Sequence, residues 1–310
     1  MLKKINSPIL LICFNRPDLT LRVLDQIRKV KPKKLYIAID GPRNKLDQEK
    51  ISGVKSVIKT VNWTCIVKTK FQKKNLGCKY GPVTAMNWFF DNEKRGIILE
   101  DDVLADKSFF YFADQLLKQY ASNEKVGSIS GNNFQFGVKR GEGSFYFSRY
   151  SHSCGWATWR RAWRHYDVDI SDYENVSKST LNKVFDKWID KIYWKLIFGG
   201  IRSGEIDSAW DYQWNWMMWK NNMLGIIPNV NLVENLGFGR KDATHTKFRS
   251  RFARQKTEPI SFPLVVPKNI TRNVEADNYV QKHNYVLWKE IAMNLFRKFS
   301  IIKRKTICRF

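Results

Sequence analysis

The sequence contains few cysteines and few histidines. Its five cysteines are odd in number and include no Cys-x-x-Cys pair, so the sequence indicates neither a disulfide framework nor a zinc ribbon. Cysteine usage of this kind is typical of a reducing compartment. We therefore expect buried thiols and a cytoplasmic protein.

Long hydrophobic runs are also lacking. The most apolar stretch near the start, residues 8–14, is much shorter than the roughly 18 residues that a membrane helix requires. Asn15-Arg16-Pro17-Asp18 follows it, where a signal peptide would have small residues and a cleavage site. We expect neither a membrane span nor a signal peptide.

Acidic residues are scarce relative to basic ones. The chain has 29 Asp and Glu against 54 Lys and Arg, a formal net charge of +25. This excess favours partners that carry negative charge, namely nucleotides, nucleic acid or anionic lipid, without choosing among them. With 310 residues, 43% apolar and 14% aromatic, the chain can bury a sizeable core, which excludes wholesale disorder.

Apolar segments alternate with amphipathic ones in the first 100 residues. Four short apolar runs predict buried strands, at 8–14, 35–39, 65–67 and 96–99. Apolar residues at helical spacing follow the first run and predict a helix. Residues 83–90, just before the last run, predict another helix. This alternation predicts an α/β fold, a Rossmann-like, mostly parallel twisted sheet flanked by helices. Ligands of such sheets lie at the carboxyl ends of the strands, where Arg16, Asp40 and Asp101 fall.

The second half has a different composition. Nine of the 12 tryptophans lie between residues 145 and 220, and we expect most of them in a core that packs directly on the sheet. Residues 240–310 carry 17 Lys and Arg against 5 Asp and Glu. We expect this basic C-terminal part to be an appendage.

Three carboxylates, Glu100-Asp101-Asp102, follow the strand predicted at 96–99. Their mutual repulsion is costly unless a cation or a hydrogen-bond network offsets it. Mg²⁺ or Mn²⁺ is the simplest remedy, because these ions often take one or two carboxylates and complete their shell with substrate phosphates. The alternative is a solvated acidic turn that caps the helix predicted over 109–120.

A second candidate acid, Asp211, stands between tryptophans in Trp210-Asp211-Tyr212-Gln213-Trp214. A carboxylate walled by large rings has a raised pKa and can act as a general base toward a hydroxyl. The alternative is an N-cap for the helix predicted over 212–219. Asp207 is a less enclosed competitor.

The loop over residues 237–246 combines glycines with cations. Gly237 and Gly239 permit bending, Arg240 and Lys241 can contact phosphates, and the His245 imidazole can ligate a metal. The alternative for His245 is a solvated loop histidine.

Four blocks in the same order resemble the GT-A nucleotide-sugar glycosyltransferases. The likeness is to the N-acetylglucosaminyltransferase I family and its bacterial nucleotide-diphospho-sugar transferase relatives. The blocks are residues 8–17, 98–103 with Phe109-Phe110, 209–214 and 237–241. The resemblance implies a GT-A catalytic domain over 1–246, with a nucleotide-sugar half at 1–130 and an acceptor and catalytic half at 131–246. The basic C-terminal extension is then 247–310.

The resemblance also implies roles for single residues. Asp211 matches the catalytic base, and Trp210 would pack against the transferred sugar. Asp102 would contact Mn²⁺ or Mg²⁺, with His245 as a further ligand. The remaining donor-binding residues are Arg16 near the diphosphate, Asp40 at the base, Glu100 and Asp101 at the sugar and ribose, and the cations Lys79, Arg240 and Lys241. Lys79 replaces a nucleotide-contacting histidine that the animal family has and this chain lacks.

These implications predict an inverting, metal-dependent glycosyltransferase. Its donor would be a nucleoside-diphosphate sugar, with uridine as the first expectation, and its acceptor a glycan or lipid-linked glycan in surface polysaccharide synthesis. A sugar-phosphate nucleotidyltransferase is an alternative, but its glycine-rich loop is replaced here by Asn15-Arg16-Pro17-Asp18. A nucleic-acid-binding protein is another, and there Glu100-Asp101-Asp102 would oppose the phosphate backbone, so we expect no nucleic-acid partner.

The end of the chain has the pattern of a basic amphipathic helix. Apolar positions from Ile291 to Ile307 interleave with cations from Arg297 to Arg309. Such helices lie in the headgroup region of anionic membranes, which predicts peripheral attachment to the inner face of a membrane. The alternative is a terminal helix packed on the catalytic domain.

Overall fold

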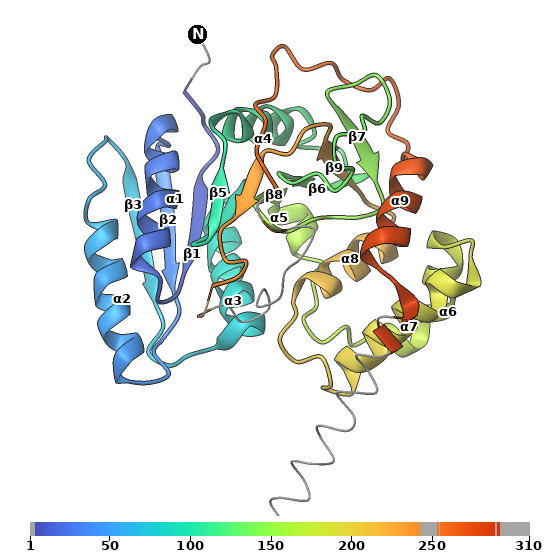
Figure 1. Ribbon diagram of the computed structural model, residues 1–310, viewed down its shortest axis with the longest axis horizontal. Coiled ribbons are helices and arrows are strands. Elements are labelled where there is room, and N and C mark those ends of the chain that lie inside the picture. The colour runs from blue at the N-terminus through green and yellow to red at the C-terminus, as the bar shows by residue number, and fades with distance from the viewer. Residues whose placement is uncertain (1–3, 241, 243–252, 254, 289, 292–310) are drawn as a thin grey trace, which may run out of the picture.

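An eight-stranded sheet runs through the centre of the molecule in the computed structural model (Figure 1). The structure describes residues 4–240, 242, 253, 255–288 and 290–291. The strand order is β3-β2-β1-β4-β8-β6-β9-β7. The strands are β1 (Ile9–Cys13), β2 (Lys34–Ile39), β3 (Ile66–Phe71), β4 (Arg95–Glu100), β6 (Val126–Ser130), β7 (Phe145–Ser148), β8 (Trp156–Trp159) and β9 (Leu224–Pro228). A second, two-stranded sheet pairs β5 (Val103–Ala105) with β10 (Val233–Asn235).

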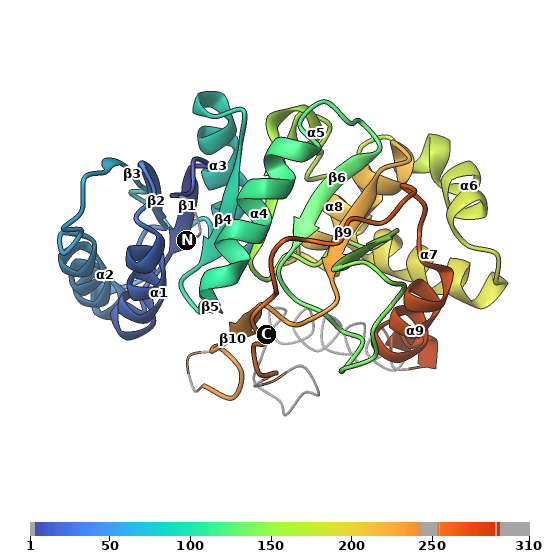
Figure 2. The ribbon, with the colours of Figure 1, turned by 90° about the horizontal axis from the view of Figure 1, so that it is seen from above.

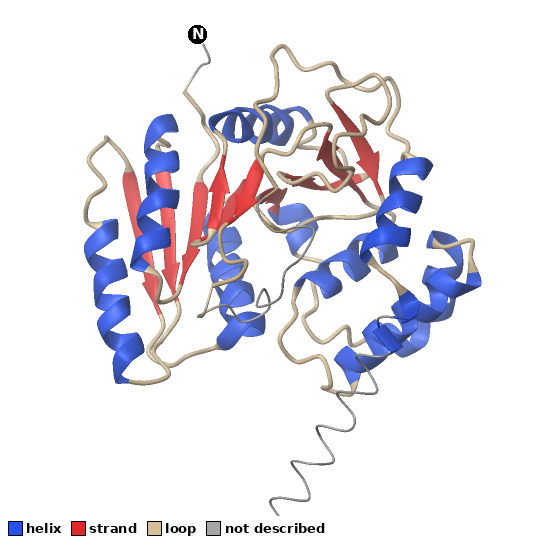
Figure 3. Cartoon of the chain, in the orientation of Figure 1, coloured by secondary structure: helices blue, strands red, loops and turns tan. Residues whose placement is uncertain are grey.

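Helices cover both faces of the large sheet (Figures 2 and 3). They are α1 (Pro17–Val30), α2 (Lys45–Ile58), α3 (Gly77–Asn92), α4 (Lys107–Gln119), α5 (Arg160–Trp163), α6 (Tyr173–Val184), α7 (Trp188–Arg202), α8 (Asp211–Lys220) and α9 (Val274–Asn284). Successive strand residues face opposite sides. Leu99 joins the core formed with α1, α2 and α4, whereas Ile98 joins the core formed with α3, α5 and α8.

The predicted α/β fold with a mostly parallel, helix-flanked sheet is confirmed. Strands β3, β2, β1 and β4 are parallel neighbours. The side chains of β1, β2 and β4 are mostly apolar and buried because helices cover both faces, whereas those of the edge strand β3 are mostly exposed. Two strands depart from this pattern. β8 runs antiparallel to β4 and β6, and β7 runs antiparallel to β9.

The aromatic half forms its own core beside the sheet. Trp194, Trp216 and Trp219 are at most 3% exposed and pack with Tyr150 among α6, α7, α8 and α9. A second group joins this half to the first half of the chain, since the rings of Phe90 on α3 and Trp163 on α5 lie 6.0 Å apart. The two halves therefore pack directly on each other, as the missing linker predicted.

The basic C-terminal part is not an appendage where the structure describes it. Ile260 and Leu264 are buried in the core of the α1 and α4 face. Asp277 on α9 is fully buried, accepts a hydrogen bond from Ser148 Oγ at 2.6 Å and lies 3.4 Å from Arg272 Nη1. The expectation was wrong because net charge does not show which apolar residues are buried. The helix predicted at the end of the chain lies outside the described residues.

No helix in the described part of the chain is long and apolar enough to cross a membrane.

Candidate functional site

The order of strands reverses at β1, which pairs with β2 on one side and with β4 on the other. In open α/β sheets, ligands bind in the crevice outside the carboxyl ends of the strands at such a switch point. Ile12 of β1 pairs with Glu100 at the end of β4. The loop after β1 and the three acids at the end of β4 therefore meet at this edge, as predicted.

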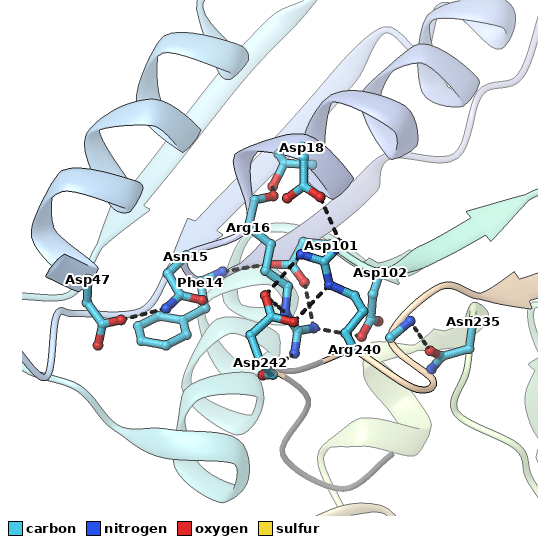
Figure 4. Close-up of polar contacts among 12 residues, drawn as sticks. Phe14, Asn15, Arg16, Asp18, Asp47, Asp101, Asp102, Asn235, Arg240 and Asp242 are labelled. Atoms are coloured by element: carbon cyan, nitrogen blue, oxygen red, sulfur yellow. Dashed lines mark hydrogen bonds and ion pairs between the residues drawn. The ribbon is translucent and has the colours of Figure 1, made fainter. Parts of the chain in front are cut away.

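Arg16 and the acids after β4 form an ion-paired cluster (Figure 4). Arg16 Nη1 lies 2.8 Å from Asp102 Oδ2 and 3.6 Å from Asp101 Oδ1. Asp101 is 6% exposed, and its Oδ2 accepts a hydrogen bond from the backbone N–H of Phe14 at 2.9 Å. Helix α4 is capped instead by Asp106, which accepts from Ser108 N. The three acids are therefore not the helix cap that the alternative required.

Burial and mutual repulsion make the cluster hard to ionise fully. Burial, followed by the charges of the neighbouring acids, raises the pKa of Glu100 to about 8 and that of Asp101 to about 7. The pKa of Asp102 is also raised, chiefly by burial, although Arg16 opposes the change. Burial and repulsion thus favour the neutral form of these acids, whereas a bound cation would favour their ionised form.

A segment that we call the strap, residues 235–240 with 242, lies over this cluster. Leu236 N donates to the Asp102 carbonyl at 2.7 Å. A Cβ on the next residue, Gly237, would lie 2.4 Å from Asp102 Oδ2, so only glycine lets the strap pass this close. The predicted glycine loop therefore does border the acid cluster. Lys241 and His245 lie outside the described residues.

Two arginines converge on one carboxylate of the strap. Arg240 contacts Asp242 through Nε at 2.8 Å and Nη2 at 3.0 Å, and it reaches Asp18 at 2.9 Å. Arg16 Nε lies 3.7 Å from Asp242 Oδ2. Asp242 thus sits between two guanidinium groups, an arrangement suited to an anion such as phosphate. Its role was not predicted, because no local pattern separates it from other loop acids.

Asp211 lies at the start of α8, near the same edge. It is the first helical residue, with Trp210 at the N-cap position, so it is not the cap that the alternative proposed. Its Oδ1 accepts from Tyr212 N at 3.1 Å, and the helix N-terminus favours its negative charge. The negative charge of Asp211 is one of the smaller causes of the raised pKa of Glu100. Asp207 is exposed.

Trp210 is 7% exposed, and its ring lies 5.7 Å from that of Trp156. The residue thus belongs to the core that supports α8. Most of its ring is covered by protein, and only a small part of it is free to meet a ligand.

Asp40 and Lys79 have contacts of their own. The Asp40 carboxylate accepts from the backbone N–H groups of Leu76 at 2.9 Å and Gly77 at 3.0 Å, and from the side chain of Asn75 at 2.9 Å. It therefore fixes the loop before α3. Lys79 on α3 is buried, with Nζ 3.2 Å from Asp169 Oδ1. No sequence signal indicated either partnership.

The carboxylates of this edge fit a metal ion only when a ligand supplies further oxygen atoms. Among the described residues, no three His, Cys, Asp or Glu side chains converge to hold a metal ion by themselves. Carboxylates nevertheless outnumber arginines around the strap, so an incoming diphosphate would be repelled unless a cation accompanied it. The donor set fits Mg²⁺ or Mn²⁺ held by Asp102 together with ligand phosphates, as is common for these ions.

Comparisons with known proteins show only distant likenesses. No family model matches the sequence, and no curated protein matches it. Among solved structures, HddC from Yersinia pseudotuberculosis is 10% identical with a TM-score of 0.33, over 50% of this chain and 77% of that chain. A UDP-glucose pyrophosphorylase complexed with UDP-glucose is 12% identical with a TM-score of 0.29, over 47% and 64%.

A third similar structure is 4-diphosphocytidyl-2C-methyl-D-erythritol synthase from Anaerococcus prevotii. It is 11% identical with a TM-score of 0.33, over 59% of this chain and 85% of that chain. Likenesses this weak carry no argument about what this chain binds.

Proposed function

We propose that this chain is an inverting glycosyltransferase of the GT-A type. It transfers a sugar from a nucleoside-diphosphate sugar, with UDP as the first nucleotide to test, to a hydroxyl of a glycan or lipid-linked glycan. The supporting observation is one shared edge of the sheet. Arg16 and the acids after β4 meet there at the switch point, and Asp211 starts helix α8, whose N-cap residue Trp210 packs on Trp156 of the neighbouring strand β8.

The chemistry is a single displacement. The acceptor oxygen attacks the anomeric carbon, the bond from that carbon to the diphosphate oxygen breaks, and Asp211 takes the hydroxyl proton. Arg16 and Arg240 stabilise the charge on the departing diphosphate. Mn²⁺ or Mg²⁺, held by Asp102 with the phosphates, would supply further positive charge. One displacement inverts the anomeric configuration, and no covalent intermediate is needed.

Nucleotide binding is the first test of this proposal. UDP with Mn²⁺ should raise the melting temperature of the wild type, because a ligand that binds the folded state stabilises it by mass action. Asp102→Ala should lose this rise. Glu93→Gln is the matched control, because Glu93 lies at the opposite edge, where it binds Tyr36 and Lys34. An unchanged Mn²⁺-dependent rise in Asp102→Ala would refute the metal assignment.

Product analysis then separates the transferase from the nucleotidyltransferase. A glycosyltransferase releases nucleoside diphosphate from a sugar nucleotide, whereas a nucleotidyltransferase releases pyrophosphate from a nucleoside triphosphate and a sugar phosphate. The loop after β1 has no glycine and enters α1 at Pro17, so it lacks the glycine-rich turn that cradles phosphates. Pyrophosphate release without any transfer would favour the nucleotidyltransferase.

We also propose that the basic C-terminal residues bring the enzyme to the inner face of a membrane that carries its acceptor. The full chain should sediment with anionic vesicles at low salt and be released at high salt. A truncation after residue 291 keeps α9 and removes the six cations between Arg297 and Arg309. Equal sedimentation of both proteins would contradict a role for the tail.

A further inference from the structure

The backbone of Arg16 is fixed at the start of α1. Its carbonyl accepts hydrogen bonds from Thr20 N at 2.9 Å and from Thr20 Oγ1 at 2.8 Å. Pro17 follows directly and restricts the backbone of Arg16 further. The side chain takes no part in these bonds and is 15% exposed. A change of partner at Arg16 therefore requires only a rotation of its side chain.

The guanidinium group of Arg16 lies between two acids (Figure 4). On one side, Nη1 contacts Asp102 Oδ2 at 2.8 Å. On the other, Nη2 donates to the Asp242 backbone carbonyl at 3.2 Å, and Nε lies 3.7 Å from Asp242 Oδ2. The group thus already faces the position between Arg16 and Arg240 that suits a phosphate, while Nη1 holds it on Asp102.

The Asp102 oxygen that Arg16 contacts has little room for a second cation. A Cβ on Gly237 would lie 2.4 Å from the same oxygen, Oδ2, so the strap is packed against it as well. The Asp102 side chain is only 14% exposed. A divalent cation on this carboxylate would stand close to the guanidinium, and like charges repel strongly in a partly buried site. Arg16 and a metal ion therefore compete for Asp102.

We propose that Arg16 exchanges partners when the nucleotide binds: its guanidinium leaves Asp102 for the diphosphate and so frees Asp102 to hold Mn²⁺ or Mg²⁺. The inference rests on the proposed function and deepens it, because Arg16 becomes the residue that couples nucleotide binding to metal binding. Such coupling is reciprocal, so each ligand raises the affinity for the other by the same factor, typically about 5-fold to 150-fold. Arg16 keeps the affinity for metal alone low.

Two variants of Arg16 and one control separate this exchange from a general effect of charge. Arg16→Gln removes the competing cation and the diphosphate contact, whereas Arg16→Lys keeps a positive charge at the same place. Arg28→Gln is the matched control, because it removes an equal charge from the other end of the same helix, where Arg28 pairs with Asp25 and contacts Thr60. The melting temperature without ligands shows that each variant is folded.

The two affinities should change in opposite directions. Affinity for Mn²⁺ alone is measured from the electron paramagnetic resonance signal of the free ion, and affinity for UDP by calorimetry at saturating Mn²⁺. Arg16→Gln should bind Mn²⁺ alone at least about fivefold more tightly than the wild type and UDP at least about tenfold more weakly. Arg16→Lys should restore the wild-type affinity for Mn²⁺, and Arg28→Gln should match the wild type in both. A merely structural role of Arg16 would not produce opposite changes.

A crystal structure of the wild type with UDP and Mn²⁺ tests the exchange without any variant. Arg16 Nη1 should contact a phosphate oxygen and lie more than about 4 Å from Asp102 Oδ2, the usual limit of an ion pair. An Arg16 side chain that still contacts Asp102 in that complex would overturn the proposal.

Two results of the titrations would also overturn it. Affinity for Mn²⁺ alone could be unchanged or lower in Arg16→Gln, or Arg28→Gln could raise it as much as Arg16→Gln does. Failure of the proposed function would look different. The wild type would then bind no UDP at any Mn²⁺ concentration, whereas the comparison of Mn²⁺ affinities would still report whether Arg16 competes for Asp102.

Discussion

Replacing Glu100 by glutamine should make the protein more stable at alkaline pH. Burial first, and then Asp102, Asp101 and Asp211, raise the pKa of Glu100 from 4.5 to about 8. The folded state therefore keeps a proton that the unfolded state releases near pH 4 to 5. The contribution of this carboxyl to stability is fully present below its unfolded pKa and is lost as pH rises through about 8. Glutamine keeps the shape and cannot ionise.

The size of the effect follows from that difference in pKa. One pKa unit corresponds to about 1.4 kcal/mol, so the raised pKa of Glu100 sets an upper bound of about 5 kcal/mol at pH 8 and above. Glu100 is partly exposed, and the same repulsion is shared with Asp101 and Asp102. We therefore expect about half the bound, roughly 2 kcal/mol.

Urea denaturation in EDTA at pH 5, 7 and 8.5 provides the measurement. The compared quantity is the free energy of unfolding of Glu100→Gln minus that of the wild type. This difference cancels buried His152, whose pKa is lowered to about 3 and whose contribution changes with the opposite sign below pH 6.5. It should be near zero at pH 5 and rise to roughly 2 kcal/mol at pH 8.5. A difference that is flat or falls with pH would refute the raised pKa.

Three further predictions follow from single carboxylates. Asp211→Asn should keep UDP affinity and lower the transfer rate by about 10² to 10⁴, whereas exposed Asp207→Asn should change neither; the reverse pattern would move the base to Asp207. Asp242→Asn should tighten UDP binding up to about fivefold, as measured by calorimetry, because it removes a surface carboxylate that competes for Arg16. Weaker binding would show instead that Asp242 orders the strap. Asp277→Ala should lower the free energy of unfolding, measured by urea titration, by about 3 to 5 kcal/mol, because it leaves the buried guanidinium of Arg149 without its carboxylate. A loss below about 1 kcal/mol would contradict this role of Asp277.

The elements that could be predicted from sequence are those whose signal is local. An apolar run as short as residues 8–14, ended by turn residues, predicts a buried strand rather than a helix, and Glu100-Asp101-Asp102 directly follows another such run. Parallel topology then brings Arg16 and these acids to the same edge of the sheet, and the strand order places them side by side, because β1 pairs with β4. The start of α8 near Asp211 could be predicted in the same way, because tryptophans at helical spacing follow it.

The remaining features depend on partners that are distant in the sequence. The Asp40 carboxylate holds the backbone of residues 75–77, and Lys79 pairs with Asp169, 90 residues away. The antiparallel direction of β8 is set by β4 and β6 on either side, not by its own four residues. Composition likewise could not predict that part of the C-terminal segment is buried, because a few apolar side chains among many cations determine which residues pack on the core.

The charge of the whole chain and the charge of the site act at different ranges. A net charge of +25 attracts an anionic sugar nucleotide over distances of the order of the Debye length, about 8 Å at physiological salt. At the switch point the balance reverses, because the acids around Arg16 outnumber the arginines. Added salt should therefore slow association of the nucleotide, whereas removal of Mn²⁺ should weaken the bound state. If salt and metal changed the same rate constant, a single electrostatic step would govern binding, and the separation of the two charge scales would be wrong.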